Sequence, residues 1–133
     1  MAGIPSTVDY PDAFRRSPPA GFDGAFHWAW ANECFPNPKD RLMDIDGFKD
    51  RRGQILIFET KDLGVKIPLG QMIGLKTLHR TGVVAVMLVW GKEEPDNGEF
   101  WFPRSPKIIK WSGVKEAQDL VRRWYNWADR GAE

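Results

Sequence analysis

The sequence predicts an α/β domain with a central mixed β-sheet flanked by helices. Two apolar segments carry this prediction: residues 55–58 and residues 83–90 are typical of buried strands, and both are too short to span a bilayer. Residues 69–81 lie between them and have the length and pattern of a helix. Because a strand, a helix and a strand follow in this order, we expect the two strands to pair in parallel.

The composition is that of an ordinary globular domain. The chain has 133 residues, 42% hydrophobic and 28% charged, with a formal net charge of +1, so affinity for nucleic acid has to come from local basic patches. The single cysteine, Cys34, provides neither an internal disulfide nor a zinc cluster. No secretion signal, no membrane segment, no Gly-rich phosphate loop and no serine-hydrolase signature is present, and we expect a cytoplasmic protein.

The N-terminal region predicts an arm followed by a short helix. Residues 1–22 are rich in Pro, Ser and Gly and lack periodicity, which indicates an extended or partly disordered arm. Residues 23–133 are expected to form a single domain. Its first element is expected to be a helix over residues 23–34, with Phe26, Trp28 and Trp30 facing the core.

A β-hairpin is predicted next. Residues 42–48 and 54–61 alternate as strands do, and the charged turn between them contains Gly53. On the second strand, Glu59 and Lys61 share one face because side chains alternate along a strand.

Two aspartates, Asp44 and Asp46, share a face of the preceding strand. The hairpin can therefore bring two carboxylates and one ammonium group together. Such a cluster can hold a divalent cation through oxygen ligands and place a lysine beside a metal-bound water, as phosphodiester hydrolysis requires. The alternative is a solvated strand edge with an ordinary Glu/Lys pair.

The remaining elements complete the predicted sheet. The helix over residues 69–81 carries apolar side chains around much of its circumference, so we expect it to be largely buried. Residues 99–103 and 107–111 predict short strands. A final helix from Ser112 to about Asp129 is expected to pack on the sheet. Its predicted apolar stripe consists of Val114, Ala117, Val121, Trp124 and Ala128.

The order of acidic and basic residues resembles a known family. Asp46, twelve intervening residues and then Glu59-x-Lys61 are similar to the motif of the PD-(D/E)XK nuclease superfamily, with the spacing of RecB-like exonucleases. The resemblance suggests a small phage-type member. The resemblance covers roughly residues 24–90 and implies a restriction-endonuclease-like fold with an αβββαβ-type core, here followed by short strands and a helix. The proline of the family name is missing before both Asp44 and Asp46, which leaves open which aspartate is the ligand.

The resemblance implies a role for each matching residue. Asp46, Glu59 and the backbone carbonyl of Thr60 would hold Mg²⁺ or Mn²⁺, and Lys61 would be the catalytic lysine. Gln71 resembles the glutamine that many members carry just beyond the motif, although a plain capping role is the alternative. Further metal ligands would come from Glu33 or Asp44, and His27 occupies a helix position at which some members carry a ligand.

The implied activity is metal-dependent hydrolysis of DNA in recombination, repair or replication, with RNA as an alternative substrate and a homodimer as a possible assembly. A catalytically inactive nucleic-acid-binding or protein-interaction module on the same fold is the competing hypothesis. Basic side chains near the site are candidates for phosphate contacts. They are Arg51, Arg52, Lys76, Arg80, Arg104 and Lys107. Trp101 and Trp111 lie among basic residues and could stack on unpaired bases, with core packing as the alternative.

Overall fold

The computed structural model describes residues 28–132, and the chain divides into two compact units, residues 1–41 and 42–133. The described part of the first unit contains one short helix, α2 (Ala29–Asn32), which has no buried residue. In this part of the predicted first helix only one turn forms, and Trp28 and Trp30 are exposed rather than facing a core. Phe26, His27 and the predicted arm over residues 1–22 lie outside the described residues.

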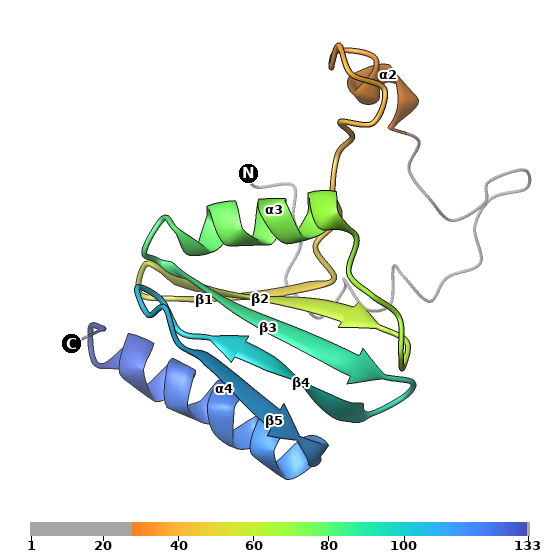
Figure 1. The fold of residues 1–133 in the computed structure, drawn as a ribbon. Helices are drawn as coiled ribbons and strands as arrows, with labels where there is room; N and C mark the ends of the chain where they lie inside the picture. The colour runs from red at the N-terminus through yellow and green to blue at the C-terminus, as the bar shows by residue number, and fades with distance from the viewer. Residues whose placement is uncertain (1–27, 133) are drawn as a thin grey trace, which may run out of the picture. The chain divides into compact units, whose positions relative to one another are not determined.

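The second unit contains a five-stranded sheet whose strands follow one another in chain order. They are β1 (Gly47–Arg51), β2 (Gln54–Lys61), β3 (Val84–Gly91), β4 (Pro95–Trp101) and β5 (Ile108–Ser112). β2 and β3 pair in parallel, and the other neighbours pair antiparallel, so the predicted mixed sheet is confirmed. Helix α3 (Leu69–His79) connects β2 to β3 on one face of the sheet, and α4 (Gly113–Asp129) covers the other face (Figure 1). None of the helices in the described part of the chain is both long enough and apolar enough to cross a bilayer.

The β1–β2 hairpin is confirmed, but its first strand lies later in the chain than predicted. β1 begins at Gly47 instead of residue 42, and the turn consists of Arg52 and Gly53 alone. Both turn residues have positive φ, 49° and 84°, as a two-residue hairpin turn that matches the strand twist requires. The preceding segment passes α3 instead of pairing with β2: Met43 lies so close to Gly74 that a Cβ there would be 2.4 Å from its Sδ. Asp44 and Asp46 therefore precede the strand rather than share one of its faces.

The connection between β3 and β4 is also shorter than predicted. β4 begins at Pro95 instead of residue 99, where the sequence predicts the strand to start, so residues 95–98 also belong to the sheet. Gly98 permits this pairing, because a Cβ at that position would lie 1.9 Å from the carbonyl oxygen of Leu88 on β3. Residues 95–98 therefore form a strand although they are polar and contain a glycine, because Gly98 leaves room for the backbone of Leu88. Composition alone does not reveal this contact.

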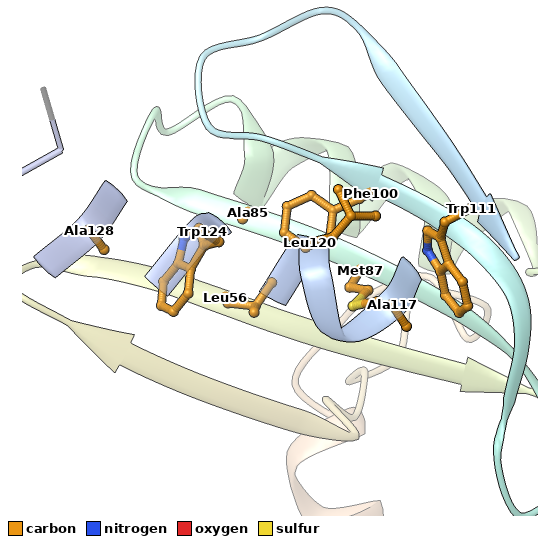
Figure 2. Packing of buried hydrophobic residues seen from close by; sticks show 9 residues of the cluster. All are labelled: Leu56, Ala85, Met87, Phe100, Trp111, Ala117, Leu120, Trp124 and Ala128. Atoms are coloured by element: carbon orange, nitrogen blue, oxygen red, sulfur yellow. The ribbon is translucent and has the colours of Figure 1, made fainter. Parts of the chain in front are cut away.

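The face covered by α4 holds the larger apolar core (Figure 2). Its sheet residues are Leu56, Ala85, Met87, Phe100 and Trp111, and its helix residues are Ala117, Leu120, Trp124 and Ala128. The predicted stripe on α4 is corrected at two positions, since Leu120 is buried and Val114 is 43% exposed. Trp111 is buried in this core, as Trp101 is on the other face, so neither can stack on unpaired bases as suggested.

The face covered by α3 holds a smaller core. Ile57, Val84, Val86, Leu88 and Trp101 of the sheet meet a single buried residue of the helix, Leu75. The prediction that this helix is largely buried was wrong: Leu69 and Ile73 are 76% and 54% exposed. Because only one side of α3 meets the sheet, its apolar circumference does not translate into burial.

Leu75→Ala is expected to lower the free energy of unfolding by about 2–4 kcal/mol, because Leu75 is the buried anchor of α3 and truncation leaves a cavity. Urea unfolding followed by circular dichroism measures the change. Leu69→Ala on the same helix is the matched control and should change stability by less than about 0.5 kcal/mol. Equal effects of the two substitutions would contradict this view of α3.

Candidate active site

The polar cluster consists of Asp46, Glu59, Lys61 and Gln71, and it lies where β2 ends. Side chains alternate along β2, so Ile57, Glu59 and Lys61 point toward the α3 face, while Phe58 and Thr60 point toward the α4 face. Gly47 pairs with Phe58, which places Asp46 beside the last residues of β2. The hairpin therefore delivers the acidic residue that precedes β1 to the Glu-x-Lys segment.

Glu59 is the centre of the cluster and is only 4% exposed. Its Oε2 accepts a hydrogen bond of 2.6 Å from Nε2 of Gln71, and Nζ of Lys61 lies 3.5 Å from the same oxygen. Gln71 reaches Glu59 because it occupies the first turn of α3, directly above this end of the sheet. Three residues that the sequence places up to twelve positions apart thus meet at one point.

Asp46 is held by Thr60. Its Oδ2 accepts hydrogen bonds from the backbone N–H of Thr60 at 2.8 Å and from the Thr60 hydroxyl at 3.0 Å. Since β1 starts only at Gly47, the carboxylate takes the place of the backbone acceptor that a longer β1 would offer to β2. The other oxygen of Asp46, Oδ1, takes no part in these two bonds.

The surroundings of Glu59 disfavour its charged form. Burial, and then the negative charge of Asp46, raise the pKa of Glu59 above its ordinary value, while Lys61 and the hydrogen bond from Gln71 act in the opposite direction. The influence of Asp46 also shows that the two carboxylates lie within electrostatic range. The single positive charge of Lys61 does not compensate the two negative charges of Asp46 and Glu59.

The atoms around Glu59 fit a hard cation. Oε1 of Gln71 is buried and accepts no hydrogen bond, although a buried acceptor without a donor is costly. Like the carboxylates of Glu59 and Asp46, it offers an oxygen atom, which is the ligand type that Mg²⁺ and Mn²⁺ prefer. Within residues 28–132 no group of three or more His, Cys, Asp or Glu side chains could hold a metal ion, so the set of oxygen ligands is sparse. Mg²⁺ tolerates a sparse set because it keeps several waters.

The other two candidate ligands are Asp44, in the same unit as the cluster, and Glu33, in the first unit. Asp44 is exposed in the segment before β1 and has no contact with Glu59 or Lys61 among the hydrogen bonds and ion pairs of the described chain. Glu33 is exposed directly after α2, in the first unit. Of the two aspartates that the sequence left as alternatives, Asp46 is the one beside Glu59.

The basic candidates fall into two groups. Lys76 is exposed on α3, the helix that carries Gln71, and Arg80 is exposed directly after this helix. Arg51 instead forms an ion pair with Asp129 of α4, with Nε 2.7 Å from Oδ1, and its guanidinium lies over the ring of Tyr125.

The remaining basic candidates are also spread over different elements. Arg104 stacks over Trp127 of α4, with its guanidinium carbon 5.7 Å from the ring centroid. Arg52 is exposed in the hairpin turn, and Lys107 is exposed between β4 and β5. Among these basic candidates, Lys76 and Arg80 are the two that lie on or directly after α3, the helix that carries Gln71 of the cluster.

The side chain of Thr60 is the member that sequence reasoning missed. Thr60 was predicted to contribute its carbonyl, whereas the structure shows its hydroxyl and N–H bonded to Asp46. A threonine in a strand is ordinary by propensity, so only the hairpin register could have indicated this contact.

Comparisons with protein-family models, curated proteins and solved structures found no match for this chain. The class that fold and site define is therefore an α/β domain with an acid, acid, lysine and glutamine cluster at a strand end.

Gln71→Leu is expected to move the acid limb of the cleavage pH profile to higher pH. The hydrogen bond from Gln71 favours the charged form of Glu59, so its loss raises the pKa of Glu59 further. At a pH on the acid limb, we expect cleavage to fall by about tenfold, the effect of one hydrogen bond to a charged group. Initial rates between pH 5 and pH 9 measure it, and Gln118→Leu on α4 is the matched control.

Proposed function

We propose that this chain is a metal-dependent nuclease that hydrolyses phosphodiester bonds in DNA, in recombination, repair or replication. One observation carries the proposal: Glu59, Lys61 and Gln71 converge at the end of β2, with Asp46 close enough to raise the pKa of Glu59. This is the set of residues that resembles the PD-(D/E)XK motif. A chance Glu-x-Lys tripeptide on a solvated strand edge would not have a buried glutamate at its centre.

Asp46, Glu59 and the backbone carbonyl of Thr60 would hold the cation. When bound, Mg²⁺ or Mn²⁺ lowers the pKa of a coordinated water and polarises the phosphate. Lys61 is 24% exposed, so its ammonium group can reach a substrate while it remains near Glu59. There it would orient the attacking water and stabilise the negative charge of the transition state. Gln71 fixes the orientation of Glu59 and leaves its own Oε1 free to accept a hydrogen bond from that water.

Lys76 and Arg80 would position the DNA. Lys76 is exposed on α3, and Arg80, four residues later, is exposed at the C-cap of this helix with helical backbone angles, so both project from the same side of the helix. Cations beside a cleavage site hold the phosphate backbone in register without reading its sequence. Arg51 is a weaker candidate, because its ion pair with Asp129 would have to break.

A catalytically inactive nucleic-acid-binding or interaction module on the same fold is the second candidate. The contact between Asp46 and Thr60 favours this second candidate, because it can equally be a structural cap at the start of β1. In that case the cluster would stabilise the hairpin and nothing more.

One experiment separates these candidates. Purified protein is incubated with labelled linear, branched and single-stranded DNA in the presence of Mg²⁺, Mn²⁺ or EDTA. Cleavage that requires the metal supports the nuclease. Binding that persists in EDTA without cleavage in any metal supports the inactive nucleic-acid-binding module, and neither binding nor cleavage supports an interaction protein.

A further inference from the structure

Thr60 is exposed at the end of β2, and its hydroxyl has a defined hydrogen-bond partner. The Thr60 side chain points away from Glu59 and Lys61, toward the α4 face, where it lines a cavity of about 450 Å³. The walls of this cavity are chiefly apolar, with Phe58, Met87, Val89 and Ala117 among them. Packing alone would be served equally well by valine, which has the same shape.

The polar partner of this hydroxyl is the carboxylate of Asp46. The hydroxyl donates to Oδ2 at 3.0 Å, and the backbone N–H of the same residue donates to the same oxygen at 2.8 Å. Two donors on one oxygen restrict the rotation of the carboxylate, although Asp46 itself is exposed and precedes the strand. The restriction leaves Oδ1 as the oxygen available to a cation.

We infer that Thr60 is a positioning residue: its hydroxyl holds Asp46 in the orientation in which the carboxylate can share a divalent cation with Glu59. This inference rests on the proposed function. Hydrogen bonds to metal-ligating carboxylates pre-orient them, and losing such a bond weakens metal affinity by about 10- to 100-fold. Side chains alternate along β2, so Glu59 and Lys61 point to one face of the sheet and Thr60 points to the other. Thr60 therefore bonds to Asp46 and not to Glu59 or Lys61.

The test is Thr60→Val in the full chain. The substitution removes the hydroxyl, keeps the backbone N–H bond to Asp46 and places a methyl group against the apolar cavity, so the melting temperature should not fall. Isothermal titration with Mn²⁺ at pH 8 should show an affinity about 10- to 100-fold below that of the native chain. In cleavage assays, the Mn²⁺ concentration for half-maximal rate should rise by a similar factor, while the rate at saturating Mn²⁺ changes little.

Three controls decide the outcome. Thr60→Ser keeps the hydroxyl and should bind Mn²⁺ like the native chain. Thr77→Val removes a hydroxyl that donates to the Ile73 carbonyl and accepts from Arg80, and it should leave the Mn²⁺ affinity unchanged. Thr60→Ala carries the same test if the valine variant does not fold. Native Mn²⁺ affinity in Thr60→Val overturns the inference alone, since the native chain would still bind and cleave. A native chain that binds no Mn²⁺ overturns the proposed function and the inference together.

Discussion

Lys61→Ala is expected to abolish cleavage while DNA binding survives. Nζ of Lys61 lies 3.5 Å from Oε2 of Glu59 and is partly exposed, so this ammonium group lies beside the site where the scissile phosphate is expected. Positioned proton-transfer groups contribute about 10²- to 10⁴-fold, and charge stabilisation at the transition state adds to this, so we expect a loss of at least about 10³-fold. The loss should not be restored by more metal, because the lysine acts on water and phosphate rather than on the cation.

The measurement is single-turnover cleavage with saturating Mg²⁺, together with fluorescence anisotropy of labelled DNA in EDTA. Lys115→Ala is the matched control, since Lys115 is exposed on α4 and belongs to the opposite face of the sheet. Full cleavage by Lys61→Ala would refute the catalytic role of this lysine. Loss of DNA binding together with cleavage would make it a phosphate-binding residue instead.

The sheet could be predicted from the sequence where burial dominates. Residues 55–58 and 84–90 are apolar because both faces of β2 and β3 are covered, and that pattern is independent of distant partners. The start of β1 could not be predicted in the same way. It depends on Met43 packing against Gly74, a contact between segments about thirty residues apart that leaves no periodic pattern.

The site shows the same division. Glu59, Lys61 and Gln71 could be selected in advance because strand alternation and the start of the next helix are local properties. The partner of Arg51 could not, because Asp129 lies 78 positions later and reaches β1 only through the packing of α4 on the sheet. Basic residues identified by composition alone therefore include some whose charge is already compensated.

A conflict between stability and activity is expected at Glu59. Burial raises its pKa, so in the folded chain this carboxyl group holds its proton to a higher pH than in the unfolded chain. Its contribution to stability is therefore lost as pH rises from the ordinary glutamate pKa through the raised one, and the cost is fully present at alkaline pH. Metal binding requires the ionised form, so the native chain accepts this cost where it would be active.

Glu59→Gln should accordingly stabilise the chain at pH 8 and abolish metal-dependent cleavage. The amide keeps the shape and can accept the hydrogen bond from Gln71, but it carries no buried charge. We expect a gain of roughly 1 kcal/mol, or a melting temperature higher by about 4–8 °C, with cleavage lower by at least about 10³-fold. Thermal unfolding from pH 4 to pH 9 measures the gain, which should disappear at the acidic end.

Glu93→Gln, at an exposed position in the connection between β3 and β4, removes the same charge away from the cluster and should change neither quantity. Mg²⁺ provides a second comparison, because a ligand that binds only the folded state raises the melting temperature. It should stabilise the native chain at pH 8 and leave Glu59→Gln unchanged. A lower melting temperature for Glu59→Gln at pH 8 would mean that the charge of Glu59 holds the fold together, and the cluster would then be structural rather than catalytic.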